Sequence, residues 1–100
     1  MLVIAGHIRL DPSKREAAIA AAKLLMQATR KEEGCAAYVF SADFEDEGVF
    51  RIFEQWESQE ALDAHFKAPH MAAFQKAVPG FGIQEMSVQR YEVSSVGPLR

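Results

Sequence analysis

The sequence contains a single cysteine, Cys35, among its 100 residues. One cysteine cannot form an intramolecular disulfide or build a cysteine-based zinc site, and such sparing use is typical of a reducing compartment. We therefore expect a cytoplasmic protein. The 14 acidic and 11 basic residues give a formal charge of -3 and form no long run of one sign. Because phosphate binding needs a basic stripe, this balance argues against a nucleic-acid partner.

Long apolar segments are also missing. The longest apolar stretch at the N-terminus covers residues 1–6 and is followed at once by His7 and Arg9. It lacks the basic and extended apolar regions of a signal peptide, so we expect no export signal, no transmembrane segment and no membrane partner. The patterns GxGxxG, GxxxxGK(S/T), GxSxG and HExxH are absent as well. Their absence argues against nucleotide chemistry and against the hydrolase classes that carry the last two patterns.

The composition is that of an ordinary globular chain, with 49% apolar and 25% charged residues. The length and this composition predict one domain over residues 1–100, in which residues 95–100 form a short C-terminal tail. A domain of this size buries little more than about 60% of its unfolded surface. We therefore expect a second subunit to add burial.

Alternating and helical patterns predict the order β-α-β-β-α-β. Strands are expected over residues 2–10, 35–44, 49–57 and 83–93, with a polar turn at residues 45–48. One helix is expected from Asp11-Pro12-Ser13 to Gly34, and a second from Gln59, interrupted at Pro69 and resumed over residues 70–77. This order predicts an α+β, ferredoxin-like fold: a four-stranded antiparallel sheet with two helices on one face.

Periodicity also predicts which side chains face the core. On the first helix these are alanines and leucines at 100° spacing, namely Ala17, Ala18, Ala21, Leu24, Leu25 and Ala28. On the third strand, Phe50, Ile52, Glu54 and Trp56 share one face, and the opposite face is also partly apolar. Since neither face of this strand is purely polar, something is expected to pack on each side of the sheet.

A few polar and aromatic residues could carry chemistry. His65, beside Leu62 and Phe66, is either a proton acceptor or a histidine at the edge of the core. Glu54, on an apolar face, is either a general base or an ion-pair partner. Trp56, Phe50, Tyr38 and Phe40 line a pocket for a flat ligand or fill the core.

The three histidines His7, His65 and His70 are weak candidates for metal ligands. His65 and His70 are five residues apart across a proline, which is poor spacing for one helical face. We therefore predict no metal site.

Three segments resemble the antibiotic-biosynthesis monooxygenase family: KEEGCAAY at 31–38, FEQWESQEALDAH at 53–65 and APHMAAF at 68–74. The chain is most similar to that family's small bacterial quinol monooxygenases. The resemblance implies a homodimer that associates through its sheets into an α+β barrel, with a pocket between the sheet and the helices of each subunit. It also implies oxygenation of a small aromatic substrate by O₂ without a cofactor, because the deprotonated substrate itself can give an electron to oxygen.

The same resemblance implies roles for single residues. Trp56 matches a tryptophan that packs beside the substrate, and Glu54 matches the acid of the same Glu-x-Trp motif. His65 matches a helix histidine and is the expected proton acceptor or hydrogen-bond donor. The expected substrate-binding residues are Tyr38, Phe40, His7, Phe66 and Phe74. Haem-degrading relatives carry an asparagine and an iron-ligating histidine where this chain has His7 and Gln75, which argues against haem.

The hypothesis is a cofactor-independent monooxygenase that oxidises a quinol or polycyclic phenol. Two alternatives stay open from the sequence. One is an isomerase of a small polar metabolite on the same scaffold, and the other is a non-catalytic, ligand-binding or stress-associated dimer.

Overall fold

Four antiparallel strands form one sheet in the computed structural model, which describes residues 1–100. The strands are β1 (Leu2–Leu10), β2 (Cys35–Ala42), β3 (Val49–Trp56) and β4 (Ile83–Glu92), in the order β2-β3-β1-β4. β1 pairs with β3 on one side and with β4 on the other along nearly its whole length. The predicted ferredoxin-like α+β fold is therefore confirmed.

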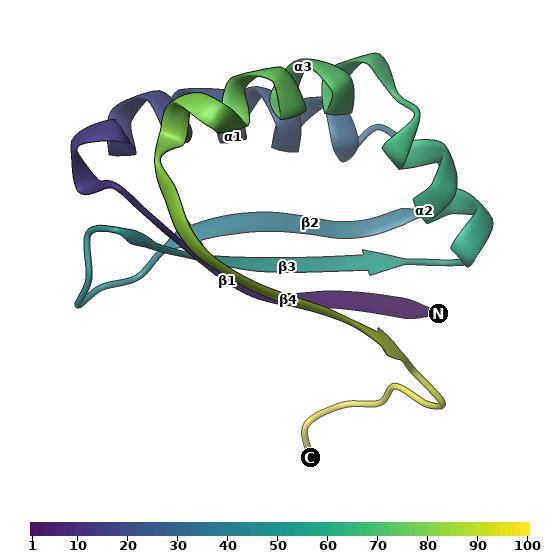
Figure 1. Ribbon diagram of the computed structural model, residues 1–100. Coiled ribbons are helices and arrows are strands. Elements are labelled where there is room, and N and C mark those ends of the chain that lie inside the picture. Colours follow the sequence, from purple (N-terminus) through teal and green to yellow (C-terminus); the bar gives the residue numbers. More distant parts are fainter.

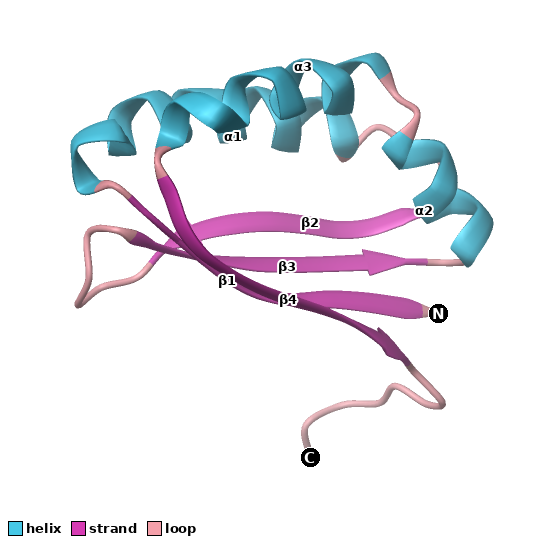
Figure 2. Cartoon of the chain, viewed as in Figure 1, coloured by secondary structure: helices cyan, strands magenta, loops and turns pink.

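All three helices lie on one face of this sheet, and the other face is bare (Figures 1 and 2). They are α1 (Arg15–Thr29), α2 (Gln59–Phe66) and α3 (Pro69–Ala77), with short 3₁₀ turns at Pro12–Lys14 and Val78–Phe81. α2 and α3 are the two halves of the second predicted helix. None of the helices is long and apolar enough to cross a membrane.

The helix starts follow local side-chain chemistry. The Asp11 carboxylate accepts a hydrogen bond from the Ser13 backbone N–H at 2.9 Å, and the Ser58 hydroxyl accepts one from the Ala61 N–H at 3.2 Å. Pro69 begins α3, where its missing N–H removes no helical hydrogen bond. The predicted interruption at this proline is confirmed, and it lets α2 and α3 point in different directions.

The first helix differs from its prediction at its end and on its face. α1 stops at Thr29, and a turn over residues 30–34 follows, closed by Gly34 at φ +84°. The core-facing residues are Ala18, Leu25 and Thr29, whereas the Leu24 side chain is 71% exposed. The buried face is therefore rotated about the helix axis from the predicted stripe: Ala18 and Leu25 belong to both, Thr29 was not predicted, and Leu24 lies outside it.

The second strand is also shorter than predicted. β2 ends at Ala42 instead of reaching residue 44, and the Phe44 side chain is fully exposed. The Asp43 carboxylate accepts hydrogen bonds from the Glu45 and Asp46 backbone N–H groups at 3.0 and 3.1 Å. This side-chain turn competes with strand pairing and begins the hairpin loop early.

Two groups of buried side chains fill the space between sheet and helices. One contains Ile8, Leu10, Ala18, Phe50, Ile52 and Phe81. The other contains Leu2, Leu25, Tyr38, Trp56 and Leu62 and lies toward the α2 end of the sheet. The second group provides the packing against which the candidate site is built.

The bare face of the sheet carries apolar side chains in the single chain. Val39 is paired with Phe53 across β2 and β3, and Phe53 is paired with Ala5 of β1. The Phe53 side chain is 43% exposed, and Tyr91 of β4 is about half exposed. The expectation that this face is not purely polar is therefore confirmed.

Gly6 permits the close approach of β1 and β4, and we predict that Gly6→Ala destabilises the fold. A Cβ atom at this position would collide with the Ser87 carbonyl oxygen and lie 2.7 Å from Val88 Cα. Since both are backbone atoms of a paired strand, relief requires a shift of the sheet, and we expect a loss of about 2 kcal/mol or more in the free energy of unfolding. Urea unfolding of the variant and the parent protein measures this loss in the free energy of unfolding.

The matched control is Gly80→Ala, because a Cβ atom there meets nothing within 4 Å. We expect this variant to unfold within about 0.5 kcal/mol of the parent protein. Equal midpoints for the two variants would show that the β1–β4 contact is not close-packed.

Candidate functional site

Four of the side chains predicted to matter meet in one buried cluster. Tyr38 comes from β2, Glu54 and Trp56 come from the same face of β3, and His65 comes from α2. Tyr38 and Glu54 are direct partners across the two strands. All four side chains are less than 9% exposed, and Trp56 is completely buried. Polar groups at this depth need partners, so the contacts within the cluster determine what it can do.

The imidazole of His65 packs against two aromatic rings that also contact each other, with 6.3 Å between the Tyr38 and Trp56 centroids. Its centroid is 4.9 Å from that of Trp56 and 5.2 Å from that of Tyr38. The Trp56 indole N–H donates a hydrogen bond to the Glu54 Oε1 atom at 2.9 Å. The rings therefore hold the imidazole in place, while Glu54 satisfies the indole.

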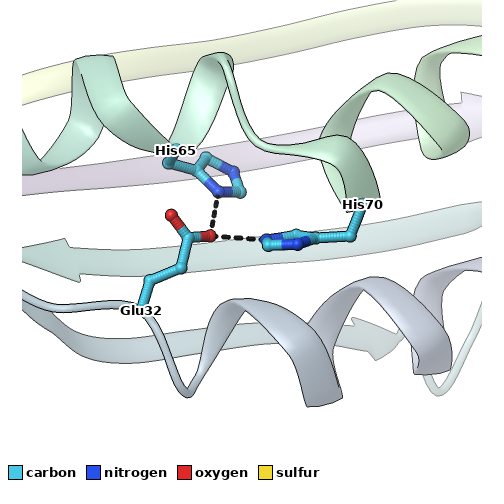
Figure 3. Close-up of side chains that lie close together, drawn as sticks. All are labelled: Glu32, His65 and His70. Carbon is cyan, nitrogen blue, oxygen red and sulfur yellow. Dashed lines mark hydrogen bonds and ion pairs between the residues drawn. The ribbon is translucent and has the colours of Figure 1, made fainter.

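Glu32 connects this cluster to His70. Its Oε2 atom lies 2.7 Å from His65 Nδ1 and 2.7 Å from His70 Nε2. Figure 3 shows the carboxylate between the two imidazole rings, with Glu32 in the turn after α1. On its other side, His65 Nε2 lies 3.3 Å from the Tyr38 hydroxyl. A continuous hydrogen-bonded chain thus runs from the buried phenol to the partly exposed His70.

Burial controls the charge of the other ionisable groups in the cluster. Burial, followed by the negative charges of Glu54 and Glu32, raises the pKa of the Tyr38 phenol far above its usual value. Tyr38 is therefore a neutral hydrogen-bond donor. Burial also raises the pKa of Glu54, against the lowering effect of the Trp56 hydrogen bond. The pKa of the Cys35 thiol is raised chiefly by burial, so this cysteine is not an activated nucleophile.

The spacing of His65 and His70 in the sequence predicted that they would not share a site, but in the structure their side chains lie close together. That prediction assumed one continuous helix, whereas the break at Pro69 places them on two helices. Together with Glu32 they offer three potential metal-ligand atoms within 4.8 Å of one another. The N···O separations are the lengths of charge-assisted hydrogen bonds, so the three side chains already satisfy one another.

An aromatic row leads from the cluster to a small internal cavity. Ring centroids are 5.5 Å apart for Tyr38 and Phe40, 5.9 Å for Phe40 and Phe74, and 5.9 Å for Phe74 and Phe81. The cavity has a volume of about 20 Å³ and an entirely apolar lining. The lining residues are Ile8, Leu10, Ala18, Ala22, Phe40, Phe50, Phe74 and Phe81. This volume holds about one water molecule and is much smaller than an ordinary ligand pocket.

A larger hollow of about 220 Å³ lies between α1 and α3. Its lining includes Leu24, Leu25, His70 and Phe74. Phe74 therefore contacts both the internal cavity and the outer hollow. It is the one residue that lines both spaces.

Two of the predicted substrate-binding residues lie apart from these features. His7 is on the bare face of the sheet, where its Nε2 atom is 3.5 Å from the Glu85 carboxylate. Phe66 is 54% exposed on the outer side of α2, although its ring centroid is 5.8 Å from that of His65. Phe40 and Phe74 line the cavity, and Tyr38 lies in the cluster.

Glu32 and His70 were not among the predicted site residues. The signal for His70 was present in the sequence, because the predicted break at Pro69 separates it from the helix that carries His65. Glu32 was assigned to the first helix, so its place in a turn facing α2 and α3 could not be foreseen.

Known proteins resemble this chain in sequence and in structure. The sequence model of a family described as antibiotic biosynthesis monooxygenase matches residues 1–77. The Synechocystis protein sll1783 is 31% identical over 98 residues, which cover 98% of this chain and 67% of that protein. The Escherichia coli K12 protein named "Probable quinol monooxygenase YgiN" is 32% identical over 99 residues, covering 89% of this chain and 94% of that protein.

The fold has a near match among solved structures. A crystal structure from Deinococcus radiodurans superimposes with a TM-score of 0.90, covering 100% of this chain and 99% of that chain. The two sequences are 23% identical, so this match establishes the shared fold.

The buried Glu54 carboxyl predicts a pH-dependent stability. Because burial raises its pKa above the ordinary value of 4.5, the folded protein favours the protonated acid. Its contribution to stability is fully present below pH 4.5 and is lost as the pH rises through the raised pKa. Glu54→Gln stays neutral and still offers an oxygen to Trp56. The free energy of unfolding of Glu54→Gln, relative to the parent protein, should therefore increase as the pH rises from about 4 to 7.

Urea unfolding followed by Trp56 fluorescence, at one fixed protein concentration, measures this difference. Glu60→Gln is the control, because Glu60 is an exposed residue of α2. Identical pH slopes for Glu54→Gln and the parent protein would mean that Glu54 ionises freely.

Proposed function

The chain belongs to the antibiotic biosynthesis monooxygenase family, and from this premise we propose that it oxidises a quinol or polycyclic phenol with O₂ and without a cofactor. The observation that carries the proposal is the buried cluster of Tyr38, His65 and Trp56, in which an imidazole nitrogen faces a neutral phenol at 3.3 Å. This cluster contains a proton acceptor and aromatic surfaces for a flat ring, and its side chains are shielded from bulk water.

The proposed reaction requires few chemical steps from the protein. A phenolic substrate loses its O–H proton to His65, and the resulting electron-rich anion can transfer an electron to O₂. After the two radicals combine, one oxygen atom stays on the ring and the other leaves as water, with both hydrogens supplied by the substrate. No external reductant is needed, so the protein has to remove a proton, orient a planar anion and keep water away.

We propose that the substrate occupies the space along the aromatic row. Phe40 and Phe74 line the internal cavity, and Trp56 and Tyr38 lie at the end of the row nearest His65. Since the cavity of about 20 Å³ is too small for an aromatic ring, entry requires displacement of Phe74 toward the outer hollow. In this arrangement Glu54 holds the Trp56 indole through its 2.9 Å hydrogen bond.

The remaining substrate-binding predictions are Phe66 and His7. Phe66 lies at the outer edge of α2 beside His65 and lines neither the internal cavity nor the outer hollow. His7 is on the opposite face of the sheet and could reach a substrate only of a second subunit packed there. The proposed location is the cytoplasm, which the unpaired Cys35 supports.

The first experiment follows dissolved oxygen while hydroquinones, naphthoquinols and anthrones are added to metal-free protein. Uptake in proportion to protein, above the autoxidation of each compound, would support an oxygenase that needs no cofactor. Conversion of substrate without oxygen uptake would favour an isomerase. Saturable quenching of the fluorescence of buried Trp56 without any conversion would favour a binding protein.

His65→Asn tests the proton acceptor. Asparagine keeps an N–H group that can reach Glu32 but has no basic nitrogen, so the network can persist while the base is lost. We expect kcat to fall about a hundredfold, the usual lower range for loss of a general base. Lys67→Ala, an exposed neighbour, is the control. Unchanged kcat in His65→Asn, with an intact fold by circular dichroism, would exclude His65 as the base.

We also propose that two chains associate through the bare faces of their sheets. Phe53, Val39 and Tyr91 are large apolar side chains left exposed there. Phe53→Glu would place a charge in the middle of such an interface, where an unpaired buried charge costs several kcal/mol. We therefore expect light scattering coupled to size exclusion to show a dimer for the parent protein and a monomer for Phe53→Glu.

Leu24→Glu is the matched control, since Leu24 is an exposed apolar residue on the helical side of the molecule. This variant should remain a dimer. A parent protein that elutes as a monomer at micromolar concentration would refute association through the sheet.

A further inference from the structure

One carboxylate oxygen in this protein accepts hydrogen bonds from two imidazoles. Glu32 Oε2 lies 2.7 Å from both His65 Nδ1 and His70 Nε2 (Figure 3). Glu32 is not far from solvent, at 15% exposure, and His70 is more open still, whereas His65 is completely enclosed. The buried imidazole of His65 is therefore hydrogen-bonded to the Glu32 carboxylate, which is in turn hydrogen-bonded to the more exposed His70.

This arrangement determines which nitrogen of His65 carries the proton. An ionised carboxylate can only accept hydrogen bonds, so His65 Nδ1 must carry the hydrogen that it donates to Glu32. A neutral imidazole has one N–H group, which leaves a lone pair on Nε2. The neutral Tyr38 hydroxyl, 3.3 Å away, then donates to that lone pair. Both ring nitrogens of His65 therefore have a complementary partner.

We propose that Glu32 and His70 are positioning residues for His65, and that Tyr38 passes the substrate proton to it. This inference rests on the proposed function. In the step, the substrate O–H bond breaks, its proton goes to the Tyr38 oxygen, and the original Tyr38 proton goes to His65 Nε2. The electron pair stays on the substrate oxygen, and no tyrosinate forms. The resulting imidazolium is stabilised by the Glu32 charge at 2.7 Å.

His70 keeps the Glu32 carboxylate from rotating. Glu32 sits in a turn, where a glutamate side chain is otherwise free to adopt several rotamers. The hydrogen bond from His70, at the start of α3, ties that turn to the helix and fixes the oxygen that faces His65. Loss of His70 should therefore weaken the arrangement less than loss of Glu32.

The tautomer can be measured without any substrate. Long-range ¹H–¹⁵N spectra distinguish an imidazole protonated on Nδ1 from one protonated on Nε2. We expect His65 of the parent protein in the Nδ1–H form, and a shift toward the Nε2–H form in Glu32→Ala. Glu33→Gln, in the same turn but exposed, should leave the spectrum unchanged. An Nε2–H form in the parent protein, or no change in Glu32→Ala, would overturn the proposal.

Turnover provides the second test. Glu32→Gln keeps the size and an acceptor oxygen but removes the charge, so we expect kcat to fall about tenfold to a hundredfold with KM changed less than about twofold. His70→Ala should lower kcat by a smaller factor, and His70→Gln, which retains an N–H donor, should restore part of it. Unchanged kcat in Glu32→Gln would overturn the proposal.

The two tests separate this inference from the proposed function. If the parent protein consumes no oxygen with any quinol, the monooxygenase proposal fails, while the spectra still decide whether Glu32 sets the state of His65. If oxygen is consumed and the tautomer is Nε2–H, the function stands and the positioning role is refuted.

Discussion

The hydrogen bonds that Glu32 accepts from His65 and His70 are the interaction on which the arrangement of the site depends. His65 is buried against two aromatic rings, and an unpartnered imidazole at this depth would cost about 1 to 3 kcal/mol in lost hydration. Tyr38 satisfies one nitrogen and Glu32 the other. Because Glu32 also binds His70, the same carboxylate holds α2, α3 and the turn after α1 together.

The site is closed in the single chain. The aromatic row is packed ring against ring, and the internal cavity of about 20 Å³ leaves no space for a second aromatic system. Close packing stabilises the empty protein, and a ligand must replace the contacts that it displaces. Phe74 and Phe40 are both only partly buried, and each lines the internal cavity and borders an outer hollow.

The fold was predictable from the sequence because its signals are local. Strand alternation, the Asp11 and Ser58 helix starts and the break at Pro69 each act over a few residues. The cluster of Tyr38, Trp56 and His65 was predicted residue by residue, through the family resemblance. Glu32 was missed because its role depends on where α1 ends, and the helix was predicted to continue to Gly34 instead of stopping at Thr29. His70 was missed because a one-helix spacing rule was applied across a proline that breaks the helix.

The two faces of the sheet are physically linked through β3. This strand is paired on both sides, and its successive side chains alternate between the site and the bare face, with Glu54 and Trp56 on one side and Phe53 and Gln55 on the other. A subunit packed on Phe53 would therefore fix the backbone that positions Glu54 and Trp56, without placing any atom in the cluster. It would also exclude water from the bare face of the sheet. The cluster on the other face would then be shielded from solvent on both sides of the sheet.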